Sequence, residues 1–234
     1  MRGIVSSDNR AANAVHPRVQ RVAHGERLYR NGAPANTMFV IRSGSYKTVI
    51  STAVGHEQVI DFMGSGDLLG LDGVGSGAYR LDAVALEDGH VCALPWFTLL
   101  KLAREVPALQ ERLFALLADQ GVREREALAI LGSLGAKERV SAFLLQQSEG
   151  HARRGYSSRR FVMRMSRNEI ASYLGLTLET VCRKLACLAA EGTIRLAGRE
   201  LEIVDFDRLN SHCSGAMRRP AAVPASPEAA TASA

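Results

Sequence analysis

Hydrophobic positions change their spacing along the chain, and each spacing predicts a different kind of structure. Between residues 27 and 95, short and partly alternating apolar runs such as MFVIR, YKTVI, EQVIDFM and VCALPW are separated by glycine-containing turns. Several short strands at near-regular spacing predict a sandwich or barrel-like β domain. From Pro107 onwards the spacing becomes helical, and proline is favoured in a first helical turn. One long helix is therefore predicted through about Leu134.

The long helix carries a stripe of positions that alternate spacings of four and three, as in a heptad repeat. The stripe is apolar at both ends and polar in the middle. Such a stripe predicts the seam of a two-stranded homodimer, and the alternative is that it packs on the chain's own β domain. Its members are Leu109, Leu113, Leu116, Gln120, Arg123, Ala127, Ile130 and Leu134.

A second domain is predicted after the long helix. AKERVSAFLLQQSE indicates an amphipathic helix, and the basic loop HARRGYSSRR follows it. SRNEIASYLG and TLETVCRKLACLAAEG then predict two helices around a tight turn, and TIRLAGRELEIV predicts two strands. The expected α+β organisation is a flexible N-terminus (1–20), a β domain (21–106), a long helix (107–135), a C-terminal domain (136–212) and a disordered Ala/Pro/Ser-rich tail (213–234).

The two short helices have the signals of a helix–turn–helix. Ser166 is a good N-cap, and Glu169 stands three residues later to close a capping box. Gly175 allows the sharp turn, after which Thr177 caps the second helix with Thr180 three residues on. The predicted inner faces are Ile170, Ala171 and Leu174 on the first helix and Val181, Leu185 and Leu188 on the second.

The exposed face near the start of the second helix has the chemistry of major-groove reading. Arg183 can donate two hydrogen bonds to guanine, and Glu179 can accept from a cytosine or adenine amino group. Cys182 lies beside Arg183 on the same face. The alternative for Glu179 and Arg183 is an ordinary surface ion pair. The side chains expected to contact the DNA backbone are Ser166, Arg167, Thr177, Thr180 and Lys184.

Charge supports a nucleic-acid partner for the C-terminal half. The 234 residues carry a net charge of +5, and the first 136 residues hold 14 Lys and Arg against 14 Asp and Glu. Residues 137–219 hold 15 against 9, so the basic excess lies at one end. No apolar run approaches the ~18 residues of a membrane span, and no signal peptide is evident. We therefore expect a cytoplasmic protein without membrane association.

The sequence offers little support for catalysis or for a cofactor. Four cysteines lack CxxC spacing, so neither a zinc site nor a disulfide framework is indicated. Six histidines show no HxH or HxxxH spacing, and neither a GxSxG motif nor a P-loop is present. We expect a non-enzyme with no metal and no cofactor.

Four motifs resemble the Crp–Fnr family of bacterial transcription regulators, most closely its Fnr–FixK branch. They are GDLLGLDGVGSG, VCALPWFTLLKL, AKERVSAFLL and MSRNEIASYLGLTLETVCRKLACLAAEGTI, and the resemblance covers about residues 20–210. It implies a cyclic-nucleotide-binding-type β-roll, a dimerisation helix and a winged helix–turn–helix. It also implies a homodimer that binds double-stranded DNA at an inverted repeat and recruits RNA polymerase, here through the loop around DFMGSGD.

Departures from the family pattern bear on the signal. Family members that bind cyclic AMP carry a Gly-Glu pair and then an Arg-Ser pair, but here Gly-Glu is absent and Arg80 precedes Leu81 and Asp82. Fnr-type sensors hold an iron–sulfur cluster with four cysteines. Here residues 1–91 contain no cysteine, and Cys92 is the single match to a cluster ligand of the family. The resemblance therefore implies a FixK-like regulator of low-oxygen respiration or nitrogen fixation that needs no effector.

Three hypotheses remain open from the sequence. A Crp-type regulator gated by haem or a small molecule is the alternative, with His24, His56 and His90 as conceivable haem ligands. The tail could be read by a housekeeping protease. In the Fnr branch a Glu-x-x-Ser-Arg pattern reads a TTGAT-type half-site, and Cys182 replaces that serine. Since a helix N-terminus and Arg183 should favour the thiolate, oxidation of Cys182 is a candidate off-switch for DNA binding.

Overall fold

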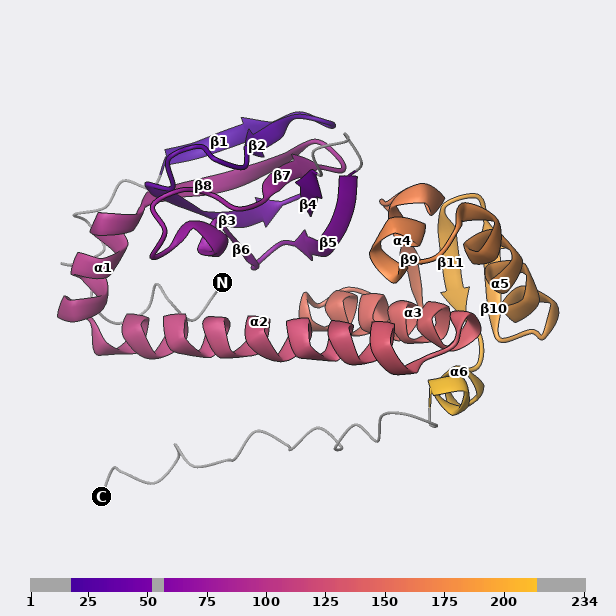
Figure 1. The fold of residues 1–234 in the computed structure, drawn as a ribbon. Coiled ribbons are helices and arrows are strands. Elements are labelled where there is room, and N and C mark those ends of the chain that lie inside the picture. Colours follow the sequence, from indigo (N-terminus) through magenta and orange to yellow (C-terminus); the bar gives the residue numbers. More distant parts are fainter. Residues whose placement is uncertain (1–17, 52–56, 214–234) are drawn as a thin grey trace, which may run out of the picture.

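Two antiparallel sheets form the N-terminal β-roll of the computed structural model, which describes residues 18–51 and 57–213 (Figure 1). The strand orders are β1-β8-β3-β6 and β2-β7-β4-β5. Tyr29, Ile41 and Tyr46 are buried between the sheets, and the Tyr29 and Tyr79 rings stack at 4.0 Å. The strands are β1 (Arg18–Val22), β2 (Arg27–Tyr29), β3 (Thr37–Ser43), β4 (Ser45–Ser51), β5 (Glu57–Gly64), β6 (Leu68–Leu69), β7 (Asp82–Ala85) and β8 (Gly89–Pro95), with the 3₁₀ turn η2 (Leu71–Gly73) after β6.

Two helices follow the β-roll, and the long one is the helix predicted from Pro107. Helix α1 (Trp96–Glu105), which the sequence did not predict, packs at the end of the roll, and α2 (Pro107–Ser133) runs beneath it (Figure 1). Pro107 occupies the first helical turn, where its missing N–H costs nothing. No helix within the described ranges is long and apolar enough to cross a membrane.

The predicted heptad stripe of α2 faces the chain's own protomer. Leu109, Leu113 and Leu116 pack on a buried cluster of Met38, Leu68 and Leu99. Within one protomer these leucines are partly buried, which is the packing that the alternative describes. The role of the stripe in a dimer stays a prediction. The remaining members are placed similarly: Gln120, Arg123 and Ala127 line a cavity against the β-roll, and Ile130 and Leu134 are buried.

A different stripe of α2 is exposed. Phe114, Leu117 and Leu128 keep 63%, 45% and 70% of their surface in solvent. With Gly121 and Glu124 between them, these positions also follow each other at spacings of three and four. The large apolar side chains of this second stripe (Phe114, Leu117, Gly121, Glu124 and Leu128) are exposed in a single protomer, and Leu117, Gly121 and Glu124 also border the cavity beneath the β-roll.

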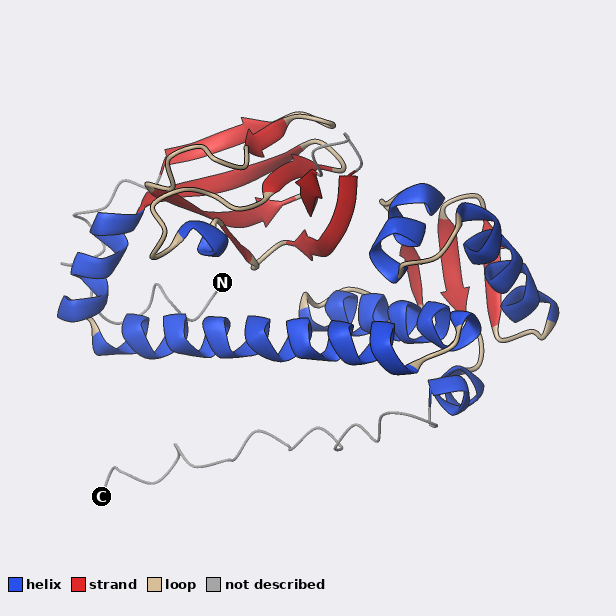
Figure 2. Ribbon diagram, in the orientation of Figure 1, coloured by secondary structure: helices blue, strands red, loops and turns tan. Residues whose placement is uncertain are grey.

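The C-terminal domain packs two short helices and a small sheet against α3 (Figure 2). The sheet order is β10-β11-β9, so the two predicted strands gain a third from the end of the basic loop. A final helix was also absent from the prediction. The elements are α3 (Ala136–Arg153), β9 (Arg160–Val162), α4 (Arg167–Leu174), α5 (Leu178–Ala190), β10 (Ile194–Ala197), β11 (Glu200–Ile203) and α6 (Phe206–Cys213).

Some sequence predictions concern residues outside the described ranges. Most of the predicted flexible N-terminus, His56 and all of the tail after Cys213 lie there, and so does the proposed protease signal.

Candidate DNA-binding site

Local capping builds the helix–turn–helix as the sequence predicted. The Ser166 hydroxyl accepts a hydrogen bond from the Glu169 backbone N–H at 3.2 Å, and the Glu169 carboxylate accepts from the Ser166 N–H at 2.6 Å. Gly175 has a φ of 60°, a left-handed conformation that costs glycine little and so permits the turn. The Thr177 hydroxyl then accepts from the Thr180 N–H at 3.2 Å and starts α5.

Apolar packing fixes α5 against the rest of its domain. Val181, Leu185 and Leu188 are at most 3% exposed, and each contributes roughly 1.5–3 kcal/mol by leaving water. Ile170, Ala171 and Leu174 of α4 join the same core, with Leu176 packed at its edge. Because one face of α5 is held inward, the opposite face has a defined orientation toward solvent.

The exposed face of α5 carries the three predicted base-reading residues. The Arg183 guanidinium lies 3.5 Å from the Glu179 carboxylate, and these side chains remain 63% and 85% exposed. Cys182 is exposed beside them. Arginine and glutamate here can each form hydrogen bonds to base edges, and their mutual contact limits the conformations of both side chains.

The predicted backbone contacts are placed less uniformly. Ser166 and Thr177 are exposed, but their hydroxyls already act as helix caps, while Thr180 and Lys184 are half-buried. Arg167 is also half-buried, and its Nη2 lies 3.5 Å from the Gly198 carbonyl at the β10–β11 turn. Arg167 therefore links the first helix to the wing as well as standing at the DNA-facing edge.

The wing adds basic side chains that the sequence analysis did not select. Arg199 is exposed at the tip of the β10–β11 hairpin, and Arg195 on β10 is 72% exposed and 3.3 Å from Glu202. A basic residue directly after an Ala-Gly turn was the available signal for Arg199. Such residues can contact phosphates next to the groove that α5 enters.

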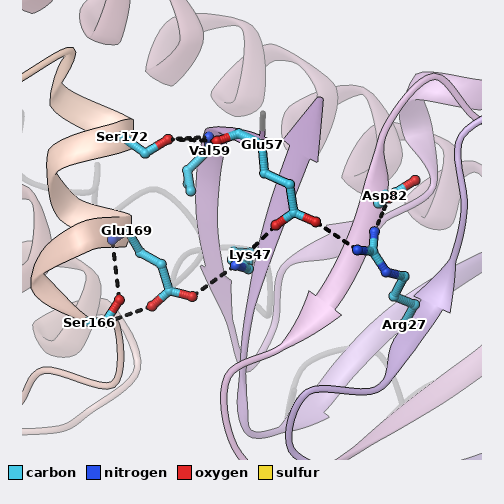
Figure 3. A network of polar contacts seen from close by, with 8 residues as sticks. All are labelled: Arg27, Lys47, Glu57, Val59, Asp82, Ser166, Glu169 and Ser172. Carbon is cyan, nitrogen blue, oxygen red and sulfur yellow. Dashed lines mark hydrogen bonds and ion pairs between the residues drawn. The ribbon is translucent and has the colours of Figure 1, made fainter. Parts of the chain in front are cut away.

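A polar network joins the helix–turn–helix to the β-roll (Figure 3). The Lys47 ammonium lies 2.9 Å from the Glu169 carboxylate and 3.8 Å from that of Glu57. Glu57 pairs with Arg27 at 2.6 Å, and Arg27 also contacts Asp82. We call Lys47, Glu57 and Glu169 the Lys47 bridge. In this bridge the Glu169 carboxylate, which caps α4, forms an ion pair with Lys47 on strand β4 of the β-roll.

The edge of β5 strengthens this connection. The Ser172 hydroxyl accepts from the Val59 N–H at 2.9 Å and lies 3.2 Å from the Glu57 carbonyl, to which it can donate. The Gln58 side-chain amide donates to the Ser172 carbonyl. Both faces of α4 are thus engaged by the chain itself, one by its own domain core and the other by the β-roll.

Charge balance around Glu169 favours its ionised form. Burial alone would raise its pKa, but the hydrogen bonds from Lys47 and from Ser166 outweigh burial, so the pKa of Glu169 lies below its ordinary value. The carboxylate is therefore ionised near neutral pH, as both the capping box and the Lys47 bridge require.

The four thiols differ in exposure and environment. Burial raises the pKa of Cys92, and burial with the Glu138 charge raises the pKa of Cys213 to about 11. Cys187 is half-buried, and its sulfur lies 3.1 Å from the Glu191 carboxylate. The hydrogen bond to Glu191 raises the pKa of that thiol. Cys182 is the exposed one.

The β-roll lacks a ready place for a cyclic phosphate. The Asp72 carboxylate accepts hydrogen bonds from the backbone N–H groups of Arg80 and Leu81 at 2.8 and 2.9 Å. These are the donors that a phosphate would need in the predicted binding segment. Asp82 is buried against Arg27, so the carboxylate that would repel a phosphate at these N–H groups is that of Asp72.

Of the three histidines suggested as haem ligands, the two that the structure describes do not converge on the β-roll cavity. His24 and His90 are exposed and lie apart from the lining of the cavity of about 290 Å³ between the roll and α2. In the described part of the chain no group of three potential metal-ligating side chains occurs.

Together these features define a two-domain DNA-binding protein, with a β-roll connected by a long helix to a winged helix–turn–helix. Residues 19–105 match the cyclic nucleotide-binding domain family, and residues 138–211 match the Crp-like helix-turn-helix domain family. The chain belongs to the Crp–Fnr family of DNA-binding transcription regulators.

Curated relatives in several bacteria are regulators. The chain is 38% identical over 189 residues to the transcriptional regulatory protein btr of Bordetella pertussis, covering 81% of this chain and 78% of that one. It is 33% identical to electron transport regulator A of Shewanella oneidensis, covering 82% and 77%. It is 34% identical to the fumarate and nitrate reduction regulatory protein of Escherichia coli K12, again covering 82% and 77%.

A solved structure also resembles the whole architecture. FixK2 from Bradyrhizobium japonicum is 28% identical to this chain, with a TM-score of 0.76 over 84% of this chain and 97% of that one. The predicted fold class is confirmed by this similarity and by the two family matches.

Proposed function

We propose that this chain is a FixK-like transcription activator that binds, as a homodimer, inverted repeats with TTGAT-type half-sites. The observation that carries the proposal is the capped, firmly packed α5 with Glu179, Cys182 and Arg183 on its free face. Arg183 donates to guanine and Glu179 accepts from the opposite base edge, while Ser166, Arg167, Thr177, Thr180 and Lys184 contact the backbone. The protein acts by binding DNA and not as an enzyme.

The biological role follows from similarity. Relatives named for electron transport and for fumarate and nitrate reduction, and the similarity to FixK2, support control of low-oxygen respiration or nitrogen-fixation genes. The lack of cysteine before Cys92 speaks against an Fnr-type cluster. The Asp72 carboxylate occupies two backbone N–H donors where a cyclic phosphate would be held, which supports DNA binding without a cyclic nucleotide.

We propose that the dimer forms through the second stripe of α2 and not through the stripe predicted from the sequence. Phe114, Leu117 and Leu128 are large apolar side chains that an isolated protomer leaves in water, and burying them in a partner is favourable. Gly121 allows close approach of the two helices. A twofold axis along this seam would present two α5 helices to the two half-sites of an inverted repeat.

We propose that RNA polymerase contacts a surface other than the DFMGSGD loop, which the family resemblance had suggested. Phe62 of that segment packs with Phe143 and Tyr173, at ring distances of 6.0 and 5.3 Å, and Asp67 pairs with Arg154. Most of the segment therefore faces the chain's own C-terminal domain. RNA polymerase would have to contact other exposed parts of the dimer.

Cys182 oxidation is proposed as a means of switching DNA binding off. The thiol is exposed on the reading face, and Arg167 and Arg183 lie near it. A sulfinate there would repel DNA phosphates and could draw Arg167 away from the backbone. The reduced side chain is small enough to fit against a base.

Selection of bound duplexes from a random pool, followed by sequencing, tests the proposed function. The purified protein, with no added ligand, should enrich a twofold-symmetric site with TTGAT-type halves. Enrichment of an unrelated motif would refute the half-site assignment. A requirement for haem or another added ligand, with a Soret band in the case of haem, would favour the effector-gated alternative.

A further inference from the structure

A second cavity lies between the β-roll and the C-terminal domain. Its volume is about 510 Å³, within the range that holds a drug-sized ligand, and it is lined by the β3–β4 turn, the end of β5, the end of α3 and β9. Its lining does not include η2 or the segment that follows, where the family's cyclic nucleotide site would be expected. It is also larger than the cavity of about 290 Å³ beneath the roll.

The lining of this interdomain cavity is strongly cationic. Arg42 comes from the β-roll, and Arg154, Arg160 and Arg164 come from the C-terminal domain, while Glu87 is the carboxylate of the lining. Glu202, which is not part of the lining, lies 3.4 Å from Arg160. Guanidinium groups bind phosphate oxygens through paired hydrogen bonds, so four of them around one cavity favour a phosphate-bearing ligand.

Two of these arginines also connect the domains. The Arg154 Nη2 lies 3.0 Å from the Asp67 carboxylate, and the Arg164 Nε lies 3.1 Å from Glu87. Gly64 makes room for the first contact, because a Cβ there would stand only 2.7 Å from the Arg154 Cζ. Arg154 is therefore held in a close-fitting position across the domain boundary.

One wall of the cavity is aromatic. The His151 and Phe161 rings stack at 4.8 Å, 19° from parallel, and Tyr156 meets His151 edge-on at 6.2 Å. Burial, with the charges of Arg154 and Arg164, lowers the pKa of His151, so its ring is uncharged near neutral pH. A flat heteroaromatic ring could pack here beside the arginines.

We propose that the interdomain cavity binds a small phosphate-bearing molecule with a flat ring, of the chemical class of free nucleotides. Its phosphates contact Arg42, Arg160 and Arg164, and its ring lies near His151 and Tyr156. The phosphates compete with Glu87 for Arg164, one of the arginines that join the domains. Ligand binding therefore alters how the domains are held and, by linkage, changes DNA affinity and ligand affinity by the same factor. This proposal does not depend on the FixK-like assignment.

Calorimetric titration of the full-length protein with ATP as the probe tests the site, with pyrophosphate and adenosine as separate ligands. We expect saturable ATP binding, weaker pyrophosphate binding and no adenosine binding. Joint substitution of Arg42→Gln and Arg160→Gln should weaken ATP at least tenfold. Arg21→Gln, an exposed arginine on the far strand β1, is the matched control and should bind ATP as the unchanged protein does. Far-UV circular dichroism confirms that all variants are folded.

Other outcomes overturn the proposal. Equal loss in the Arg21→Gln control, or equal binding by all proteins, would show only general attraction to a basic chain. ATP should still bind when the protein is saturated with the selected duplex, with a changed affinity. Complete displacement of ATP by the duplex, together with a smaller salt dependence of DNA binding in the double variant, would assign the cavity to the DNA backbone instead.

Discussion

At the scale of single residues, the reading face depends on two side chains that also hold each other. The Glu179–Arg183 contact is exposed, so it adds only about 0.3–0.5 kcal/mol to the helix itself. A good base contact is worth about 1–3 kcal/mol of discrimination. The pair is therefore expected to matter far more for DNA recognition than for folding.

Joint substitution of Glu179→Ala and Arg183→Ala should abolish preference for the TTGAT-type repeat over a scrambled site. The dimer should persist, since both side chains are exposed on α5 and neither belongs to α2. Gel-shift titrations with the two duplexes and analytical ultracentrifugation give the two readouts. An unchanged ratio of affinities would refute the base-reading assignment.

Cys182 gives a second residue-scale prediction. Peroxide should abolish specific DNA binding by the unchanged protein but spare Cys182→Ser, because the exposed thiol is converted to a charged oxyacid. Fluorescence anisotropy with labelled operator, before and after peroxide, measures the effect. Cys187→Ser is the matched control and should remain sensitive. Equal loss in unchanged protein and Cys182→Ser would end the idea.

At the scale of elements, the outcome of each prediction depended on how local its cause is. The capping box of α4 and the Thr177 cap of α5 each lie within four residues, so Ser166 and Thr177 could be recognised from spacing alone. The long helix and its start at Pro107 were predicted, but the face of the helix that packs on the β-roll was not. Two stripes of α2 satisfy the heptad spacing, and only the position of the β-roll decides which one is covered.

The reassigned seam predicts which substitution dissociates the dimer. Leu128→Asp places a charge at the most exposed apolar position of the second stripe and should yield monomers that lose operator affinity by at least tenfold. Val122 is also on α2 and is 51% exposed, but it stands off the stripe, so Val122→Asp should leave the dimer intact. Sedimentation velocity across a concentration series separates the two. Dissociation by both, or by neither, would contradict the seam.

At the scale of the whole molecule, the domain contacts could not be foreseen from the sequence. Ser172 and Glu57, which form a hydrogen bond, are 115 residues apart in the sequence. Arg154 and Asp67, which form an ion pair, are 87 residues apart. Nothing in the local pattern around Lys47 indicates that it meets the capping carboxylate of a distant helix. The same separation explains why the cavity between the domains was not predicted, since Arg154 and Arg160 belong to the basic loop but Arg42 lies more than 100 residues earlier in the chain.

The Lys47 bridge gives a prediction about pH and stability. Its side chains are largely shielded from water, with Lys47 at 13% and Glu169 at 20% exposed, so Lys47→Met should cost ~1–2 kcal/mol of unfolding free energy at pH 7. Because the folded pKa of Glu169 is lowered, the bridge is fully present above the ordinary glutamate pKa and is lost as pH falls through the lowered one. The difference between the two proteins should therefore shrink below about pH 4.

Urea unfolding from pH 7 to pH 3 measures that difference, with Lys101→Met as the control because Lys101 is exposed on α1. The control should match the unchanged protein at every pH. A Lys47→Met deficit that stays constant across the range would mean that the lysine stabilises through its hydrocarbon chain, since only the ionic part of the contact depends on Glu169 being charged. If the deficit disappears on acidification, the domains are joined by charge, and an anion that competes for such charges can loosen them.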